Sequence, residues 1–229
     1  MGKAENTTKM KENLENEISN IWSELLQCTE NCNGINIDQE KGIIPRCLLL
    51  EKENRNIKTE GCIIVGLNPG TSKNREREGY QKMIRDGTIQ HLWNTKPEHK
   101  YYTLLRKFAK NAGFEGIILW TELVKCECAP HKMAKDIPLQ TYRNCVGKYL
   151  TKELDTIDTN WVIVAVGRET HKALSYLYPQ RTIIGIPHPT ASRGYFARLF
   201  NGENFKKNVK ETIDNIKENR GNTIWLNEE

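Results

Sequence analysis

The sequence has no uninterrupted apolar run long enough to cross a membrane, and charged residues make up 28% of its 229 residues. It begins with "MGKAENTTKMKENLENE", a stretch too acidic and too polar for a secretory signal. Internal repeats, low-complexity tracts and long linkers rich in Gly, Pro or Ser are also absent. We therefore expect a soluble cytoplasmic chain that folds as one domain over residues 1–229, with an N-terminal helical segment at 1–27 packed on it.

Short apolar runs alternate with amphipathic stretches along the chain. The runs "GCIIVGL" (61–67) and "WVIVAVG" (161–167) are typical of strands buried on both faces. Further strands are expected at 46–51, 116–123 and 182–189, and helices at 6–26, 101–114, 168–178 and 202–220. This alternation predicts a three-layer α/β/α domain with a mostly parallel central sheet.

Two strands end in unusual polar turns. Asn68 lies in "GLNPG" after the first buried strand, and His188 is held between two prolines in "GIPHPTASRGYF". Ligands of open α/β sheets bind at the carboxyl ends of strands, so both turns are candidate sites. A phosphate-binding loop is excluded, because Gly70 is followed by Thr71-Ser72-Lys73 rather than by Lys and Ser or Thr. The alternative is ordinary Asn-Pro-Gly turn chemistry.

Disulfide bonds are not expected for the seven cysteines of a cytoplasmic chain. Cys47 and Cys62 lie in apolar strand-like runs, where buried free thiols are common. The others lie in polar, turn-rich segments, at Cys28, Cys32, Cys126, Cys128 and Cys145. Four cysteines from distant segments can close a thiolate site, which suits either zinc or an iron–sulfur cluster.

The pair of motifs "GLNPG" and, well over a hundred residues later, "HPT" resembles the signature motifs of the uracil-DNA glycosylase superfamily. "WTELVKC" and "WVIVAVG" followed by a helix are similar to segments of its iron–sulfur branch, and the matching segments run from about Cys28 to Phe196. The resemblance implies an enzyme that flips a pyrimidine out of DNA and hydrolyses its glycosidic bond without a lyase step. A monomer with DNA as its partner is expected.

The resemblance also implies roles for individual residues. His188 would stabilise the charge that develops on the departing base, and Asn68 would orient the attacking water. Because an amide cannot take a proton, we expect Asn68 to position the water rather than act as a general base. Leu67 and Tyr80 would contact the flipped base, with packing as the alternative for Tyr80.

Glu122 departs from the family pattern. Related iron–sulfur glycosylases carry Asn at this position, where it reads the edge of uracil. An ionised Glu122 offers only acceptors, which suit the exocyclic amine of cytosine, and a protonated one could also donate to the ring nitrogen. We therefore expect a cytosine-type base, modified so that the host genome is spared. The alternative is a salt bridge from Glu122 to Lys125 or Arg168, with another group reading the base.

By the same resemblance, Cys28, Cys32, Cys126 and Cys145 would hold a four-iron four-sulfur cluster with a structural role. Three residues separate Cys28 from Cys32, where the family usually has two, and Cys128 is an alternative to Cys126. Zinc is the alternative metal.

The net charge of +5 favours a polyanionic partner only weakly, but basic residues cluster after both motifs. The DNA contacts would come from Lys73, Arg75, Arg193, Tyr195 and Arg198. Tyr195, Phe196 or Leu199 could serve as the wedge that fills the gap left by the flipped base, with packing of the C-terminal helix as the alternative.

Two other functions remain open: a uracil-DNA glycosylase of base excision repair, and a non-catalytic nucleic-acid-binding protein with a redox-responsive cluster.

Overall fold

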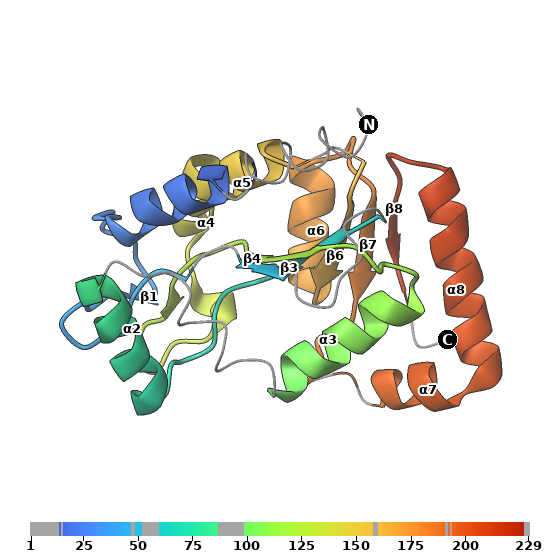
Figure 1. Cartoon of the computed structure of the whole chain (residues 1–229), viewed down its shortest axis with the longest axis horizontal. Coiled ribbons are helices and arrows are strands. Elements are labelled where there is room, and N and C mark those ends of the chain that lie inside the picture. Colours follow the sequence, from blue (N-terminus) through green and yellow to red (C-terminus); the bar gives the residue numbers. More distant parts are fainter. Residues whose placement is uncertain are drawn as a thin grey trace, which may run out of the picture. The chain divides into compact units, whose positions relative to one another are not determined.

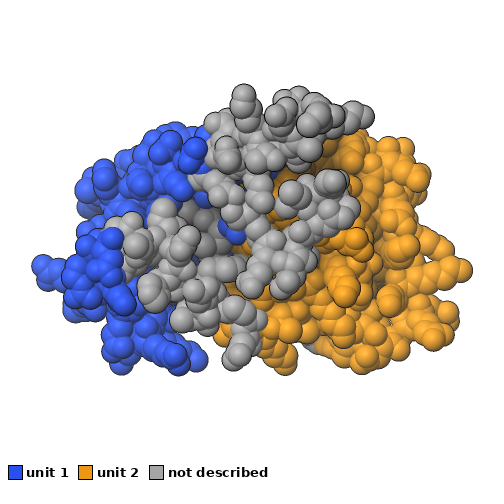
Figure 2. Space-filling view, in the orientation of Figure 1, with its two compact units in different colours: residues 1–50, 68–94, 121–159 blue, residues 51–67, 95–120, 160–229 orange. Residues whose placement is uncertain are grey.

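A computed structural model of the chain describes residues 14, 16–46, 49–51, 60–86, 99–157, 160–190, 192 and 194–226. The chain divides into two compact units (Figure 2). Unit 1 is drawn from residues 1–50, 68–94 and 121–159, and unit 2 from residues 51–67, 95–120 and 160–229. One domain over the whole chain stays a prediction. No helix within these described ranges is both long and apolar enough to span a membrane.

A six-stranded sheet forms the centre of the fold (Figure 1). Its order is β2 (Leu49–Glu51), β4 (Ile118–Glu122), β3 (Cys62–Gly66), β6 (Val162–Val166), β7 (Ile183–Ile186) and β8 (Thr223–Trp225). The pairs β3–β6, β6–β7 and β7–β8 are parallel, with Ile64 opposite Val164 and Val164 opposite Ile184. The predicted α/β class with a mostly parallel sheet is therefore confirmed.

Unit 2 surrounds four of these strands with helices. They are α3 (Lys100–Asn111), α6 (Arg168–Leu177), α7 (Tyr195–Asn201) and α8 (Glu203–Glu218). Every residue of β3, β6 and β7 is buried, which explains their continuous apolar sequences. Gly167 joins β6 to α6 with a φ of +92°, a conformation that favours glycine at this abrupt strand-to-helix turn.

Unit 1 contains the cysteine-rich segments. Residues 16–26 are helical and bury Ile18, Ile21, Trp22 and Leu25 on one face. Helix α2 (Asn74–Asp86) follows the Asn68 turn, and β1 (Ile35–Asn36) pairs antiparallel with β5 (Glu127–Cys128). After the short helix η2 (Ala134–Asp136) come three contiguous helical segments: α4 (Leu139–Cys145), the π-helical turn η3 (Val146–Leu150) and α5 (Thr151–Asp155).

Candidate functional site

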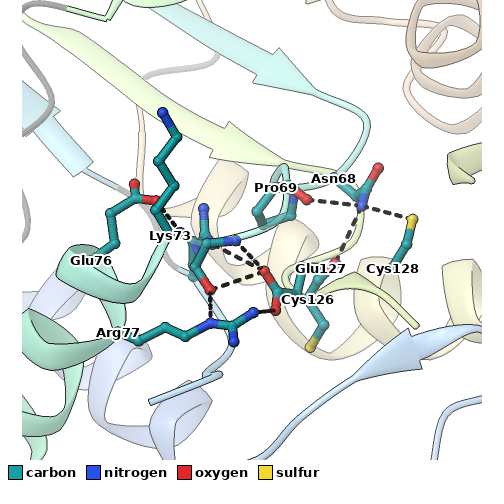
Figure 3. Close-up of polar contacts among 10 residues, drawn as sticks. Asn68, Pro69, Lys73, Glu76, Arg77, Cys126, Glu127 and Cys128 are labelled. Atoms are coloured by element: carbon teal, nitrogen blue, oxygen red, sulfur yellow. Dashed lines mark hydrogen bonds and ion pairs between the residues drawn. The ribbon is translucent and has the colours of Figure 1, made fainter. Parts of the chain in front are cut away.

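The Asn68 side chain is held against the cysteine-rich strand (Figure 3). Strand β3 ends at Gly66, and the Nδ2 amide of Asn68 donates to the Pro69 carbonyl at 3.1 Å, the Cys126 carbonyl at 3.5 Å and the Cys128 Sγ at 3.3 Å. Because carbonyl oxygens can only accept, the amide nitrogen has to face them. The Oδ1 atom then points away from these partners, so it can accept a hydrogen bond from another group.

Tyr80 lies in α2 and is only 1% exposed. The Arg46 guanidinium lies 5.3 Å from the centre of its ring, and burial raises the pKa of its hydroxyl to about 12. A ring that stacks on a flipped base needs an exposed face. The structure therefore favours the packing alternative for Tyr80 over the predicted stacking role. Leu67, the other residue expected at the base, is half-buried immediately after β3.

Glu122 is the last residue of β4 and is half-buried. Lys125 does not pair with its carboxylate. The Lys125 Nζ lies 2.6 Å from the Glu153 Oε2, and it also donates to the Thr121 hydroxyl and to the main-chain carbonyl of Glu122. The alternative in which Glu122 forms a salt bridge with Lys125 is therefore wrong. Arg168, the other proposed partner, lies in unit 2 with its guanidinium 5.2 Å from the centre of the Trp225 ring.

Four cysteines line one pocket in unit 1. They come from three segments of the chain, and the rest of the wall consists of the apolar or aromatic Ile35, Ile37 and Tyr149 and the polar Glu30 and Asn144. The four are Cys28, Cys32, Cys126 and Cys145. Cys128 is not among the lining residues, since its sulfur contacts Asn68 instead. This grouping separates Cys126 from Cys128, which the spacing of the sequence alone could not do.

The pocket disfavours bare thiolates. Burial, reinforced by the neighbouring thiols, raises the pKa of Cys126, and burial also raises the pKa of Cys32 and Cys145. Burial and the nearby Cys28 likewise raise the pKa of Tyr149, although no hydrogen bond of good geometry joins its hydroxyl to a described residue. Several thiolates can therefore coexist here only with a compensating positive charge, such as a metal centre supplies.

A single-ion site is not formed by these side chains as they stand. Within the described ranges, no three His, Cys, Asp or Glu side chains are arranged to hold one metal ion. A zinc site needs sulfurs at about 2.3 Å from a common centre, whereas an iron–sulfur cluster spreads its ligands around a larger core.

His188 lies in unit 2, two residues beyond the end of β7. The Thr190 main-chain N–H lies 3.3 Å from the His188 Nδ1, and the Thr190 hydroxyl lies 2.9 Å from the same atom. A main-chain N–H can only donate, so Nδ1 accepts and the proton of the neutral ring is on Nε2. Partial loss of hydration lowers the pKa of His188 below its usual range, which favours this neutral form.

Tyr101 of α3 packs beside the catalytic candidate. Its ring centre lies 5.2 Å from that of His188, with the planes inclined at 41°. Nothing in the amphipathic pattern of residues 101–114 distinguished this tyrosine from an ordinary core or surface residue.

The residues expected to contact DNA differ in exposure. Lys73, Arg75 and Arg198 are exposed, at the start of α2 and on α7. Tyr195 is 0% exposed and packs edge-on against Phe196 and Phe205, which favours the packing alternative over the predicted contact with DNA. Phe196 and Leu199 are buried as well, which argues against them as the wedge. Arg193 lies outside the described residues.

Three buried acids, Glu51, Glu127 and Glu153, were missed by the sequence reasoning, because nothing in their surroundings distinguished them. Glu51 pairs with Arg106. Glu153 pairs with Lys125, and Glu127 accepts hydrogen bonds from Ser72 and Arg46.

Comparison of the sequence with protein-family models finds no match, and comparison with curated proteins finds none either. The function is therefore inferred from the geometry of these residues.

Proposed function

We propose that the chain is a monofunctional DNA glycosylase, which hydrolyses the N-glycosidic bond of a flipped pyrimidine and leaves an abasic site. The observation that carries this proposal is the position of the two motifs. Asn68 and His188 each follow by two residues a buried strand, and β3 and β7 run parallel on either side of β6. Each turn therefore follows the carboxyl end of a strand, where α/β proteins bind ligands.

The chemistry of each side chain supports its role. A neutral His188 with its proton on Nε2 can donate to an oxygen of the departing base, where negative charge develops. Asn68 has its amide nitrogen committed to protein acceptors, which leaves Oδ1 to accept from a water. That water would be oriented for attack on the sugar, without transfer of its proton to Asn68.

We further propose that the base is of the cytosine type. Glu122 is the last residue of β4, at the carboxyl end of that strand, and it is half-buried. A carboxylate or carboxylic acid at this position matches the exocyclic amine and ring nitrogen of cytosine. A substituted cytosine is the expected substrate, because an enzyme that excised plain cytosine would attack its own genome.

The pocket of Cys28, Cys32, Cys126 and Cys145 supports a four-iron four-sulfur cluster as the cofactor. The support is the grouping of four thiols from three segments in one pocket, which matches the four thiolate ligands of such a cluster, and zinc is the alternative metal. Bound iron would offset the charge of the thiolates and tie the segment after the N-terminal helix to Cys126, just before β5. Its role is structural, because hydrolysis of a glycosidic bond requires no electrons.

The enzymatic proposal is tested by single-turnover base release together with DNA binding. His188→Ala should lower the rate constant by about 10²–10³-fold, the range found when one oxyanion donor is removed, while the DNA affinity stays unchanged. His131→Asn, which alters an exposed histidine, is the matched control and should keep full activity. A His188→Ala variant with undiminished base release would refute the role of His188.

The base assignment is tested by Glu122→Asn. An amide should restore the reading of uracil, so preference should shift from substituted cytosine towards uracil by about 5- to 150-fold, the range of one bidentate base contact. The measurement is the ratio of kcat/KM for the two bases. An unchanged ratio would show that another group reads the base.

A further inference from the structure

Glu127 lies between Cys126 and Cys128, and its side chain is 2% exposed. Its Oε2 accepts from the Ser72 main-chain N–H at 2.6 Å and from the Ser72 hydroxyl at 3.1 Å. Two arginines complete the surroundings. Arg46 lies 3.3 Å from Oε2. Arg77 lies 3.5 Å from Oε1 (Figure 3). A carboxylate this deeply buried is tolerated because cationic and polar donors compensate its charge.

Every described neighbour of this carboxylate is a donor. The Ser72 hydroxyl accepts from the Arg77 Nε at 3.0 Å, so its own proton is directed at Glu127. The hydrogen bonds all reach Oε2, while Oε1 faces the Arg77 guanidinium at ion-pair distance, so glutamine would turn an NH₂ group towards that cation. The position therefore requires a carboxylate rather than any polar side chain of the same size.

Residues 126–128 contact both ends of the Asn68 turn. The Glu127 carboxylate binds the main-chain N–H of Ser72, four residues beyond Asn68. The Cys126 carbonyl and the Cys128 sulfur accept hydrogen bonds from the Asn68 side-chain amide. Three consecutive residues thus determine where the turn lies and how its amide is oriented. A shift of Ser72 would carry Asn68 away from the carbonyl of Cys126, since only three residues separate Asn68 from Ser72.

We propose that Glu127 is a positioning residue for Asn68, which it acts on through the backbone of the turn. This inference rests on the proposed function, in which Asn68 orients the attacking water. Glu127 itself touches neither base nor water. Its removal should impair the chemical step, because a misplacement of about 1 Å can cost a factor of about 10² in rate.

The test compares Glu127→Gln with Glu51→Gln. Glu51 is also buried and paired with an arginine, at 2.8 Å from Arg106, and it lies on β2 rather than on the segment that binds Ser72. We expect Glu127→Gln to lower kcat by about 10- to 100-fold with little change in KM, and Glu51→Gln to leave both unchanged. In an Asn68→Ala background, Glu127→Gln should cost less than about twofold, because both changes remove the same interaction.

A readout independent of activity is the NMR signal of the Asn68 side-chain amide, assigned by its loss in Asn68→Ala. In the native protein, the hydrogen bonds of Nδ2 should slow exchange of its protons with solvent. Glu127→Gln should abolish this protection, and Glu51→Gln should preserve it. Iron content and thermal unfolding of each variant identify any loss of the cluster or of the fold.

The outcomes separate the inference from the proposed function. Failure of the native protein to release any base would overturn the proposed function. Loss of amide protection in Glu127→Gln would still support the claim that Glu127 positions the Asn68 side chain. Conversely, active enzyme with unchanged kcat and unchanged amide protection in Glu127→Gln would overturn the inference alone. An equal loss of kcat in the Asn68→Ala background would also contradict it, because Glu127 would then act independently of Asn68.

Discussion

Replacement of Lys125 by methionine should destabilise the protein strongly. Lys125 and Glu153 are both 0% exposed and lie 2.6 Å apart, and the ammonium also contacts Thr121 and the Glu122 carbonyl. Methionine fills a similar volume, so the main effect is a buried carboxylate left with Thr121 as its hydrogen-bond donor. Loss of one partner from such a pair costs about 3–5 kcal/mol, a large part of the about 5–15 kcal/mol that stabilises a typical domain.

The assay is urea unfolding under anaerobic conditions, with iron content measured for every sample. Lys152→Met is the matched control, because its pair with Glu24 is about half exposed and should contribute no more than about 1 kcal/mol. A Lys125→Met/Glu153→Leu double variant should recover most of the lost stability, since no uncompensated charge remains. A loss of less than about 1 kcal/mol in Lys125→Met, or a double variant no better than the single one, would refute the reasoning.

Two further predictions concern the proposed cofactor and His188. Cys126→Ser should lower the iron and acid-labile sulfide content of anaerobically purified protein, whereas Cys128→Ser should retain both. The reverse result would show that Cys128, rather than Cys126, is the ligand. In a ¹⁵N NMR titration, His188 should remain neutral, with its proton on Nε2, until the pH falls below about 6.5, the usual pKa of histidine. Protonation at lower pH should break the contact of Nδ1 with the Thr190 N–H and reduce base release, and a pKa above 6.5 or a proton on Nδ1 in the neutral ring would contradict the assignment.

The strands that carry the motifs could be predicted from the sequence, because burial on both faces leaves continuous apolar runs. Strands β3 and β6 are the clearest cases. The edge strand β8 was missed, since its three residues, "TIW", fall after a long helix and none of them is fully buried. The pairing of β1 with β5 was also missed, because two-residue strands carry no period that a pattern could reveal.

The candidate site was predictable at the level of residue type but not of side-chain partners. Spacing identified a cysteine site and left Cys126 and Cys128 equivalent, and only the fold shows that one lines the pocket and the other contacts Asn68. The sequence around Tyr80 and Tyr195 does not distinguish them from exposed aromatic residues. Both are buried, Tyr80 beside Arg46 and Tyr195 against Phe205. Partners of this kind depend on tertiary packing, which a local pattern does not encode.

The most direct test of the central claim is base release by the native protein from oligonucleotides that contain uracil, plain cytosine or substituted cytosines, in single- and double-stranded form. Strand breakage after alkali reports each abasic site. The account predicts release of a substituted cytosine, with uracil and plain cytosine left intact and no breakage before alkali. Release of uracil in preference to every cytosine would contradict the role given to Glu122, and release of no base at all would contradict the glycosylase itself.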